Sequence, residues 1–215
     1  MTAKAHTARK DAVKEPGLVE LVRGDFWRLI QMMDLYENEH DDFYAAAAAP
    51  TLPHPVAMRR RVKIFLMMNF IAVILIRVMH SAHRHHVWFL PRVLRDLHLA
   101  LYGNEIDPGV VIGPGFFIGH QGGNTIVAGV RIGRNVSVLG KVAIGRRGYP
   151  DTTLDGSPTI GDNVWLMHGA CVWGPIIVGS GTRVGANATL MESVPPGSIV
   201  VAPKSTVIVN PPPGW

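Results

Sequence analysis

The chain has 215 residues, a formal net charge of +5 at pH 7 and one cysteine. This length allows one or two domains with a buried core, and a single cysteine excludes an internal disulfide framework and fits a reducing compartment. The positive charge is concentrated, because six basic residues and no acidic residue lie between positions 56 and 86. This clustering indicates contact with a local anionic surface, and no nucleic-acid-reading motif is present, so no nucleic-acid partner is expected.

The first part of the chain is predicted to be helical after a disordered tail. Residues 1–15 are polar and lack the apolar run of a secretory signal. Apolar residues recur at helical spacing from Leu18 to about Tyr44, which predicts an amphipathic helix. A last helix is predicted from Val93 to Tyr102, after Pro91 and before a terminating glycine.

A basic apolar segment lies between these two helices. Three arginines and a lysine precede the apolar run Ile64–Ile76, which contains Asn69. A helix of this length spans only about 20 Å, so it is too short for a hydrocarbon core of about 30 Å. Two interpretations remain for a helix at residues 62–79: it lies in a membrane interface, or it is buried in the oligomer. The basic cluster favours peripheral contact with anionic lipid of the inner membrane, from the cytoplasmic side.

Four histidines follow this segment, at His80, His83, His85 and His86. They resemble metal ligands, but no cysteine or acidic residue accompanies them, and arginines lie beside them. We interpret them as a basic flank that faces solvent or an interface, and we expect no metal site.

A six-residue repeat dominates the second half of the chain. A helix has a period of 3.6 residues and a strand a period of 2, so a period of six predicts a coil of short strands, three to a turn. Each aliphatic residue of the repeat should point inward, and the Gly and Asn residues after it suit tight corners. The inward residues are predicted to be Ile106, Ile112, Ile118, Ile126, Ile132, Val138, Ile144, Ile160, Leu166, Val172, Val178, Val184 and Leu190.

The repeat is interrupted twice. Ile126 follows Ile118 by eight positions instead of six, which predicts a bulge, and Ile160 follows Ile144 by sixteen positions, which predicts an extruded loop. Because the regular coil is chemically inert, we expect the chemistry at these two breaks. The predicted domains are a tail at 1–15, a helical domain at 16–104 with its basic apolar segment at 56–86, a coil at 105–194 with an extruded loop at 146–159, and a C-terminal extension at 195–215.

The first bulge contains the best candidate for a catalytic base. His120 is one of two histidines in the coil, and a neutral imidazole there can take a proton from an acceptor hydroxyl. Glu105 lies fifteen residues earlier, close to one turn of the coil, and could orient the imidazole. The other coil histidine, His168, is predicted to be a wall residue. Cys171 lies beside an inward valine with no base in its motif, so we interpret it as structural.

These residues resemble the hexapeptide-repeat acyltransferases, which fold as a left-handed parallel β-helix. The strings Ile160–Trp165 and Val194–Gly197 resemble the coenzyme-A-binding end of that family, and Glu105–Gly145 is collinear with the serine acetyltransferase branch. The resemblance implies an all-β left-handed β-helix with an N-terminal helical domain, assembled as a homotrimer. It also implies acetyl-CoA as co-substrate, His120 as base and Glu105 as its partner.

The resemblance also implies ligand contacts along the coil. The residues expected to bind coenzyme A are Gly145, Arg146, Arg147, His168, Arg183, Ala186 and Lys204. The residues expected to bind the acceptor are Gln121, Asn124, Tyr149 and Asp151.

The acceptor is predicted from three departures from the serine branch. Gly119 replaces the Asp that precedes the base, Ser157-Pro158 replaces a His-Pro, and Pro211–Trp215 has no counterpart of the regulatory tail. The entry to the coil at Tyr102–Ile106, the start of the loop at Ile144–Gly148 and the basic apolar helix before the coil resemble colanic-acid-type polysaccharide O-acetyltransferases more closely. This resemblance implies acetyl transfer to a sugar hydroxyl of an exopolysaccharide or its lipid-linked precursor. The alternatives are a serine O-acetyltransferase and a non-catalytic trimeric scaffold.

Overall fold

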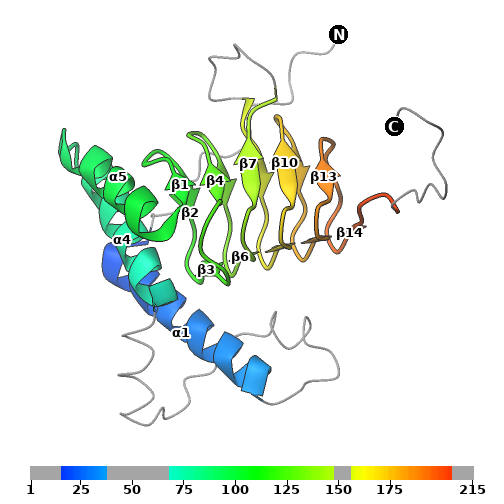
Figure 1. Ribbon diagram of the computed structural model, residues 1–215, viewed down its shortest axis with the longest axis horizontal. Coiled ribbons are helices and arrows are strands. Elements are labelled where there is room, and N and C mark those ends of the chain that lie inside the picture. The colour runs from blue at the N-terminus through cyan, green and yellow to red at the C-terminus, as the bar shows by residue number, and fades with distance from the viewer. Residues whose placement is uncertain (1–15, 38–67, 148–155, 205–215) are drawn as a thin grey trace, which may run out of the picture.

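A computed structural model describes residues 16–37, 68–147 and 156–204. Several predictions lie outside these ranges: the disordered tail at 1–15, the basic cluster before residue 68, the tip of the extruded loop and the C-terminal segment from residue 205. The described chain consists of three helices followed by a stack of short strands, with the helices at the N-terminal end of the stack (Figure 1).

The strands form three parallel sheets, which are the three faces of a prism. Sheet A contains β1 (Glu105–Ile106), β4 (Thr125–Ile126), β7 (Ala143–Gly145), β10 (Cys171–Trp173) and β13 (Thr189–Leu190). Sheet B contains β2 (Val111–Ile112), β5 (Arg131–Ile132), β8 (Thr159–Ile160) and β11 (Ile177–Val178). Sheet C contains β3 (Phe117–Ile118), β6 (Ser137–Val138), β9 (Trp165–Leu166), β12 (Arg183–Val184) and β14 (Ile199–Val200).

The fold is a left-handed parallel β-helix with an N-terminal helical region, as the repeat and the resemblance predicted. All thirteen predicted inward residues are buried, and they form one continuous hydrophobic core. Each strand has two or three residues because the chain must turn a corner after every inward side chain. Glycine at such a corner is a steric requirement: a Cβ on Gly113 would lie 2.6 Å from the carbonyl oxygen of Gly133 in the next turn.

The pairing of strands in successive turns shows how many extra residues each interruption of the repeat contains. In the regular part, Ile126 pairs with Ile144, one turn of eighteen residues later. Ile106 pairs with Ile126, so the first turn holds two extra residues, which belong to the corner between β3 and β4. Ile144 pairs with Val172, so that turn holds ten extra residues, which belong to the loop between β7 and β8.

Helix α1 (Leu18–Glu37) packs across sheet C. Its close approach depends on Gly24, because a Cβ at that position would lie 2.7 Å from the Cβ of Pro114. Arg28 then reaches the outer surface of the sheet, donates a hydrogen bond to Ser137 Oγ at 3.0 Å and lies over the ring of Trp165. Burial in this contact lowers the pKa of Arg28 to about 10.

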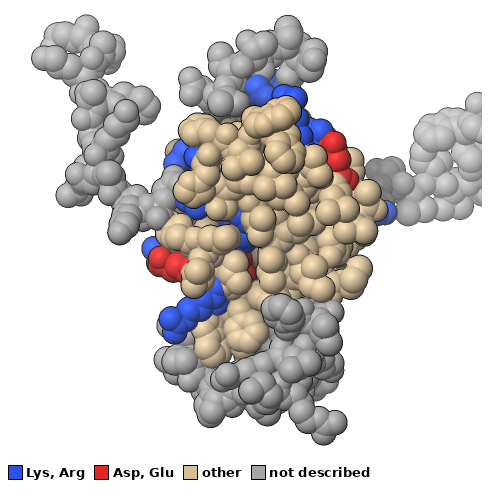
Figure 2. All heavy atoms as spheres, turned by 90° about the vertical axis from the view of Figure 1, so that its left-hand side faces the viewer, with Lys and Arg blue, Asp and Glu red and all other residues tan. Residues whose placement is uncertain are grey.

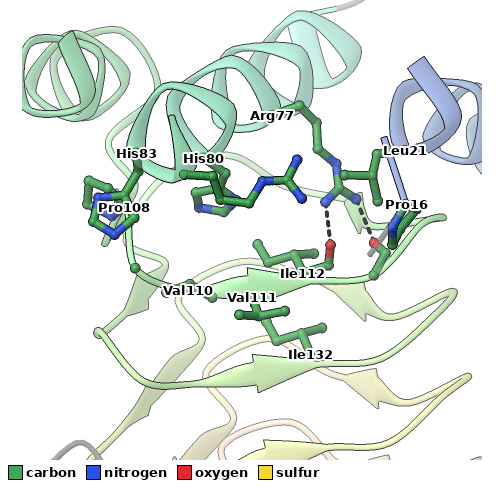
Figure 3. Close-up of a pocket in the computed structure, with 13 residues that line it drawn as sticks. Pro16, Leu21, Arg77, His80, His83, Pro108, Val110, Val111, Ile112 and Ile132 are labelled. Atoms are coloured by element: carbon green, nitrogen blue, oxygen red, sulfur yellow. Dashed lines mark hydrogen bonds between the residues drawn. The ribbon is translucent and has the colours of Figure 1, made fainter. Parts of the chain in front are cut away.

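A buried ion pair joins both long helices to the first turn of the coil. Asp25 of α1 accepts hydrogen bonds from Arg77 of α4 at 2.8 and 2.9 Å. Arg77 also donates to the carbonyl oxygens of Ile112 and Gly113, at 2.5 and 2.6 Å (Figure 3). The carboxylate of Asp25 accepts in addition from the N–H groups of residues 115 and 116, so every charged group of the pair has several partners.

Helix α4 (Met68–Arg84) corresponds to the predicted basic apolar helix. The structure supports the buried interpretation: Val73, Ile76 and Met79 belong to the core of the coil, and Phe70 packs against α1 and sheet C. The predicted membrane-interfacial position gains no support, because Val73, Ile76 and Met79 are covered by the coil. Met68, Ile71 and Val78 of the same helix remain exposed. Within the described residues, no helix is long and apolar enough to cross a membrane.

The predicted basic flank is correct only in part. His83, His85 and His86 are exposed, but His80 is only 9% exposed because it faces the first turn of the coil. Burial lowers the pKa of His80 to about 3, and the positive charge of Arg77 acts in the same direction. His80 lies on the buried side of α4, and its position in the sequence among three exposed histidines does not indicate this.

The last helix confirms its predicted signals. Helix α5 (Leu90–Tyr102) has Pro91 in its first turn, and Gly103 ends it in the left-handed conformation, with φ 67°. Its outer side exposes Val93, Leu97 and Leu101. The view onto this end of the molecule shows few charged side chains on its central surface (Figure 2).

Candidate active site

The predicted site residues fall on two different edges of the prism. The edge between sheets C and A is formed by the corners that follow β3, β6, β9 and β12. These corners stack through backbone hydrogen bonds, such as Gly169 N–H to Gly140 O at 3.0 Å and Asn187 N–H to His168 O at 2.9 Å. The edge between sheets A and B follows β7 and carries the extruded loop.

His120 lies in the widened first corner of the C–A edge, and its side chain is exposed. The two extra residues lift this corner out of the regular coil. The imidazole makes no hydrogen bond or ion pair with other described residues, so it is open to a ligand. An exposed histidine on a bulge that interrupts a rigid coil has the access that a general base needs.

The backbone of this corner is held by buried amides. The side-chain oxygen of Asn104 accepts from the N–H of Gly122 at 3.0 Å and from the Nδ2 of Asn124 at 2.8 Å. Asn124 Nδ2 also donates to His120 O at 3.3 Å, and Asn124 Oδ1 accepts from the N–H of Val142 at 3.1 Å. Asn124 is 1% exposed, so it acts on the corner from beneath; contact with an acceptor would require this network to open.

His168 shares the C–A edge with His120. A Cβ placed on Gly140 would lie 3.1 Å from the Cβ of His120 and 3.2 Å from the Nδ1 of His168, so Gly140 is enclosed by both side chains. The Nδ1 of His168 lies 3.2 Å from the carbonyl oxygen of Leu139, which favours the tautomer with its proton on Nδ1. His168 is exposed, and its Nε2 is then an acceptor beside the His120 corner.

Glu105 begins β1, at the same edge as His120 and one turn earlier. Its carboxylate is exposed, and among the described residues no hydrogen bond or ion pair joins it to the His120 imidazole. The structure therefore places the predicted base and its predicted partner on one edge without forming their contact.

The residues predicted to bind coenzyme A are divided between the two edges. His168 and Ala186 lie on corners of the C–A edge, Arg183 lies in β12 of sheet C, and Lys204 is exposed beyond β14. By contrast, Gly145, Arg146 and Arg147 lie at the A–B edge, where the extruded loop leaves the coil. Sheet A separates the two groups within one chain. The predicted acceptor residues Tyr149 and Asp151 fall outside the described residues.

The geometry gives little support to a reactive thiol at Cys171 or to a metal site among the described residues. Cys171 is half-buried in β10, and its Sγ lies 3.7 Å from the carbonyl oxygen of Gly169. No group of three or more His, Cys, Asp or Glu side chains among the described residues could hold a metal ion.

A separate hollow lies away from the His120 corner, between α4 and sheet B (Figure 3). It has a volume of about 220 Å³, and Leu21, Ile112 and Ile132 form its apolar walls, with His80 and His83 at the side of α4. It contains none of the predicted site residues.

Comparison with known proteins identifies relatives of the whole arrangement. Residues 157–191 match the family described as bacterial transferase hexapeptide (six repeats). A serine acetyltransferase of Helicobacter pylori strain J99 is 34% identical over 156 residues, which cover 73% of this chain and 90% of that protein. A serine acetyltransferase of Bacillus subtilis strain 168 is 35% identical over 134 residues, which cover 62% of this chain and 61% of that protein. The soybean serine acetyltransferase apoenzyme structure has a TM-score of 0.68 and 25% identity, and the match covers 90% of this chain and 70% of that chain.

The fold and these matches define an acyl-CoA-dependent O-acetyltransferase built on a left-handed β-helix. The chain belongs to the serine acetyltransferase family. Proteins of this fold are typically trimers.

The predicted exopolysaccharide acetylation is wrong. The curated relatives that cover most of the chain are serine acetyltransferases, and no comparison supports a closer likeness to the colanic-acid type. A glycan acceptor and an anionic-lipid partner lose their support with it. The apolar helix had favoured a membrane-side glycan, and this helix instead packs against the coil. Membership of an enzyme family also argues against the non-catalytic scaffold.

Sequence analysis missed the residues that hold the His120 corner from outside the repeat. Asn104 precedes the first strand, and Asn69 lies in the apolar run of α4. One signal was present: an Asn inside an otherwise apolar helical run needs a hydrogen-bond partner once the helix is buried.

Proposed function

We propose that this protein is a serine O-acetyltransferase that transfers the acetyl group of acetyl-CoA to the hydroxyl of L-serine. The observation that carries the proposal is the match to the Helicobacter pylori serine acetyltransferase, which spans 90% of that protein and includes the His120 corner within the shared coil. The exposed imidazole at a break in an otherwise regular coil supports it independently.

His120 is the general base of the proposed reaction. Its neutral imidazole takes the proton from the serine hydroxyl as the hydroxyl oxygen attacks the thioester carbon. The tetrahedral intermediate then breaks its carbon–sulfur bond, and the departing thiolate takes the proton back from the imidazolium. The products are O-acetylserine and free coenzyme A. Glu105 stabilises the imidazolium, which requires its carboxylate to turn toward His120 when ligands bind.

A homotrimer completes the site in this proposal. His120 and Arg147 lie on opposite edges of sheet A, so one chain cannot bring them together. In a threefold assembly of parallel coils, the C–A edge of one chain faces the A–B edge of its neighbour. Coenzyme A would lie in that groove, between His168, Arg183, Ala186 and Lys204 of one chain and the arginines that follow β7 of the next.

Serine needs counter-charges for its carboxylate and ammonium groups, and Gly119 supplies none. Lys141 offers a positive charge on the same edge: it is exposed, and a Cβ on Gly123 would lie 3.1 Å from its Cγ. Lys141 follows Gly140, which His120 and His168 enclose. We assign the serine carboxylate to this lysine and the remaining acceptor contacts to Gln121 and the extruded loop, which contains Tyr149 and Asp151.

The test is serine-dependent release of coenzyme A by the purified protein, measured as free thiol, with O-acetylserine identified by mass spectrometry. His120→Ala should lower kcat by about 10²–10⁴-fold, the usual contribution of a general base. His85→Ala, which changes an exposed histidine outside the coil, should be unaffected. Thiol release that does not depend on serine, or a fully active His120→Ala, would contradict the proposal.

A further inference from the structure

Asn69 of α4 contacts both sides of the proposed base. Its Nδ2 donates a hydrogen bond to the carbonyl oxygen of Gly119 at 3.1 Å, and its Oδ1 accepts one from Nε2 of Gln121 at 3.1 Å. Gly119 and Gln121 are the immediate neighbours of His120. One side-chain amide from the helical region therefore brackets the base, fifty residues away in the sequence.

The chain of hydrogen-bonded side-chain amides that begins at Asn69, here called the amide relay, continues into the coil. Gln121 Oε1 accepts from Nδ2 of Asn104 at 2.5 Å. The side-chain oxygen of Asn104 accepts hydrogen bonds from the N–H of Gly122 and from Asn124 Nδ2. Asn124 Nδ2 also donates to the carbonyl oxygen of His120. Asn104 and Asn124 are 0% and 1% exposed, so water does not compete for these bonds.

Backbone groups at both ends fix the direction of every amide. The carbonyl oxygen of Gly119 can only accept, so Asn69 must turn its NH₂ toward it and its oxygen toward Gln121. At the other end the N–H of Val142 can only donate, so Asn124 turns its oxygen toward it. Between these fixed ends each amide has one arrangement that satisfies all its neighbours, and the relay acts as a single rigid unit.

The His120 side chain has no such support of its own. Its imidazole makes no hydrogen bond with other described residues and is exposed, so its direction follows from the backbone of the corner. That backbone contains two glycines after Gln121, at Gly122 and Gly123, both with positive φ, and is therefore intrinsically flexible. The amide relay supplies the order that the local sequence lacks.

We propose that Asn69 is a positioning residue for the His120 base, and that through it the helical region sets the geometry of the acetyl-transfer site. The proposal rests on the proposed function for its catalytic consequence. A displacement of about 1 Å of a reacting group can cost about 10²-fold in rate. Release of the corner is therefore expected to lower kcat while leaving the coenzyme A groove, which is built from other turns, unchanged.

Two substitutions separate the parts of this interaction. Asn69→Leu removes both hydrogen bonds and keeps an apolar fill of similar size. Asn69→Asp keeps an acceptor for Gln121 but loses the donor to the Gly119 carbonyl, beside which it places a negative charge. Met68→Gln is the matched control, because Met68 is the adjacent residue of α4 and is 59% exposed.

Steady-state kinetics with acetyl-CoA and L-serine should show kcat lowered about 10- to 100-fold in both Asn69 variants, with KM for acetyl-CoA within about twofold of the wild type. Hydrogen–deuterium exchange should be faster for the amides of residues 119–124 in both variants and unchanged in Met68→Gln. A merely structural role would lower the melting temperature without this local change in exchange or the selective loss of kcat.

The results distinguish this inference from the proposed function. If His120→Ala is inactive but both Asn69 variants keep kcat within about twofold, the positioning role is refuted and the function stands. If His120→Ala is active, the proposed base is wrong, and the exchange data still decide whether Asn69 orders the corner. An equal loss of kcat in Met68→Gln would also overturn the inference.

Discussion

Removal of the Asp25 carboxylate is expected to weaken the junction between both long helices and the coil. The carboxylate accepts two hydrogen bonds from Arg77, at 2.8 and 2.9 Å, and one each from the N–H groups of Gly115 and Phe116, both at 2.9 Å. The two charged side chains are at most 2% exposed. Asp25→Ala leaves a buried guanidinium without its counter-charge and two buried N–H groups without their acceptor.

The size of the effect follows from these losses. Removal of one partner of a buried ion pair costs about 3–5 kcal/mol. The orphaned N–H groups add to this, whereas the carbonyl oxygens of Ile112 and Gly113 continue to hold the Arg77 guanidinium and offset part of it. We expect a loss of about 4 kcal/mol in the free energy of unfolding. For a chain of this size that corresponds to a fall of about 8–16 °C in melting temperature.

The assay is chemical denaturation followed by circular dichroism, for Asp25→Ala, Arg77→Met and the double variant. The double variant should be more stable than the sum of the single effects predicts, because it no longer buries an unpaired charge. Asp162→Ala is the control, since Asp162 is exposed and accepts one backbone N–H, that of Arg134 at 2.7 Å. A loss below about 1.5 kcal/mol for Asp25→Ala, or one equal to that of Asp162→Ala, would refute the reasoning.

Two further predictions concern a titrating group and a strained corner. The pKa of His80 is lowered from 6.5 to about 3 in the folded chain. Between these two pH values the unfolded chain therefore binds a proton at His80 and the folded chain does not. The free energy of unfolding should therefore fall as the pH drops from about 6.5 toward 3, by up to about 1.4 kcal/mol per pH unit. The denaturation midpoints at pH 7 and pH 5 should differ less in His80→Gln than in the wild type, and an equal difference in the two proteins would contradict this prediction. Gly140→Ala places a Cβ between His120 and His168 at φ +97° and should lower kcat at least about tenfold. Gly197→Ala is the control, because its φ is +76° and the space around it is open, and its kcat should not fall. Equal kcat values in the two variants would show that crowding of the two histidines does not matter.

The coil could be predicted from sequence because its signal is local and repeated. Each inward residue, such as Ile132, has the same place in its six-residue unit, and a register slip would expose the whole inward set. The two interruptions were visible for the same reason, as numbers that break the period. The strand register then reproduced both, with extra residues before Ile126 and between Ile144 and Val172.

The helical region was less predictable because its partners are distant in sequence. An apolar run beside arginines has the same composition whether it faces lipid or a protein core. Only the packed structure shows Ile76 and Met79 in the core of the coil and Arg77 paired with Asp25. The acceptor prediction was affected as well, because this helix was one of the features that had favoured a glycan over serine.

The sequence by itself determined the fold, the two breaks in the repeat and the histidine at the first break. Each of these depends on residues close together in the chain, or on a period that repeats. Only the tertiary structure decided what holds that histidine: Asn69 from a helix, Asn104 from the entry to the coil and Gln121 from the corner itself. Hydrogen bonds among such residues carry no periodic signal, because their spacing is set by how the helix docks on the coil.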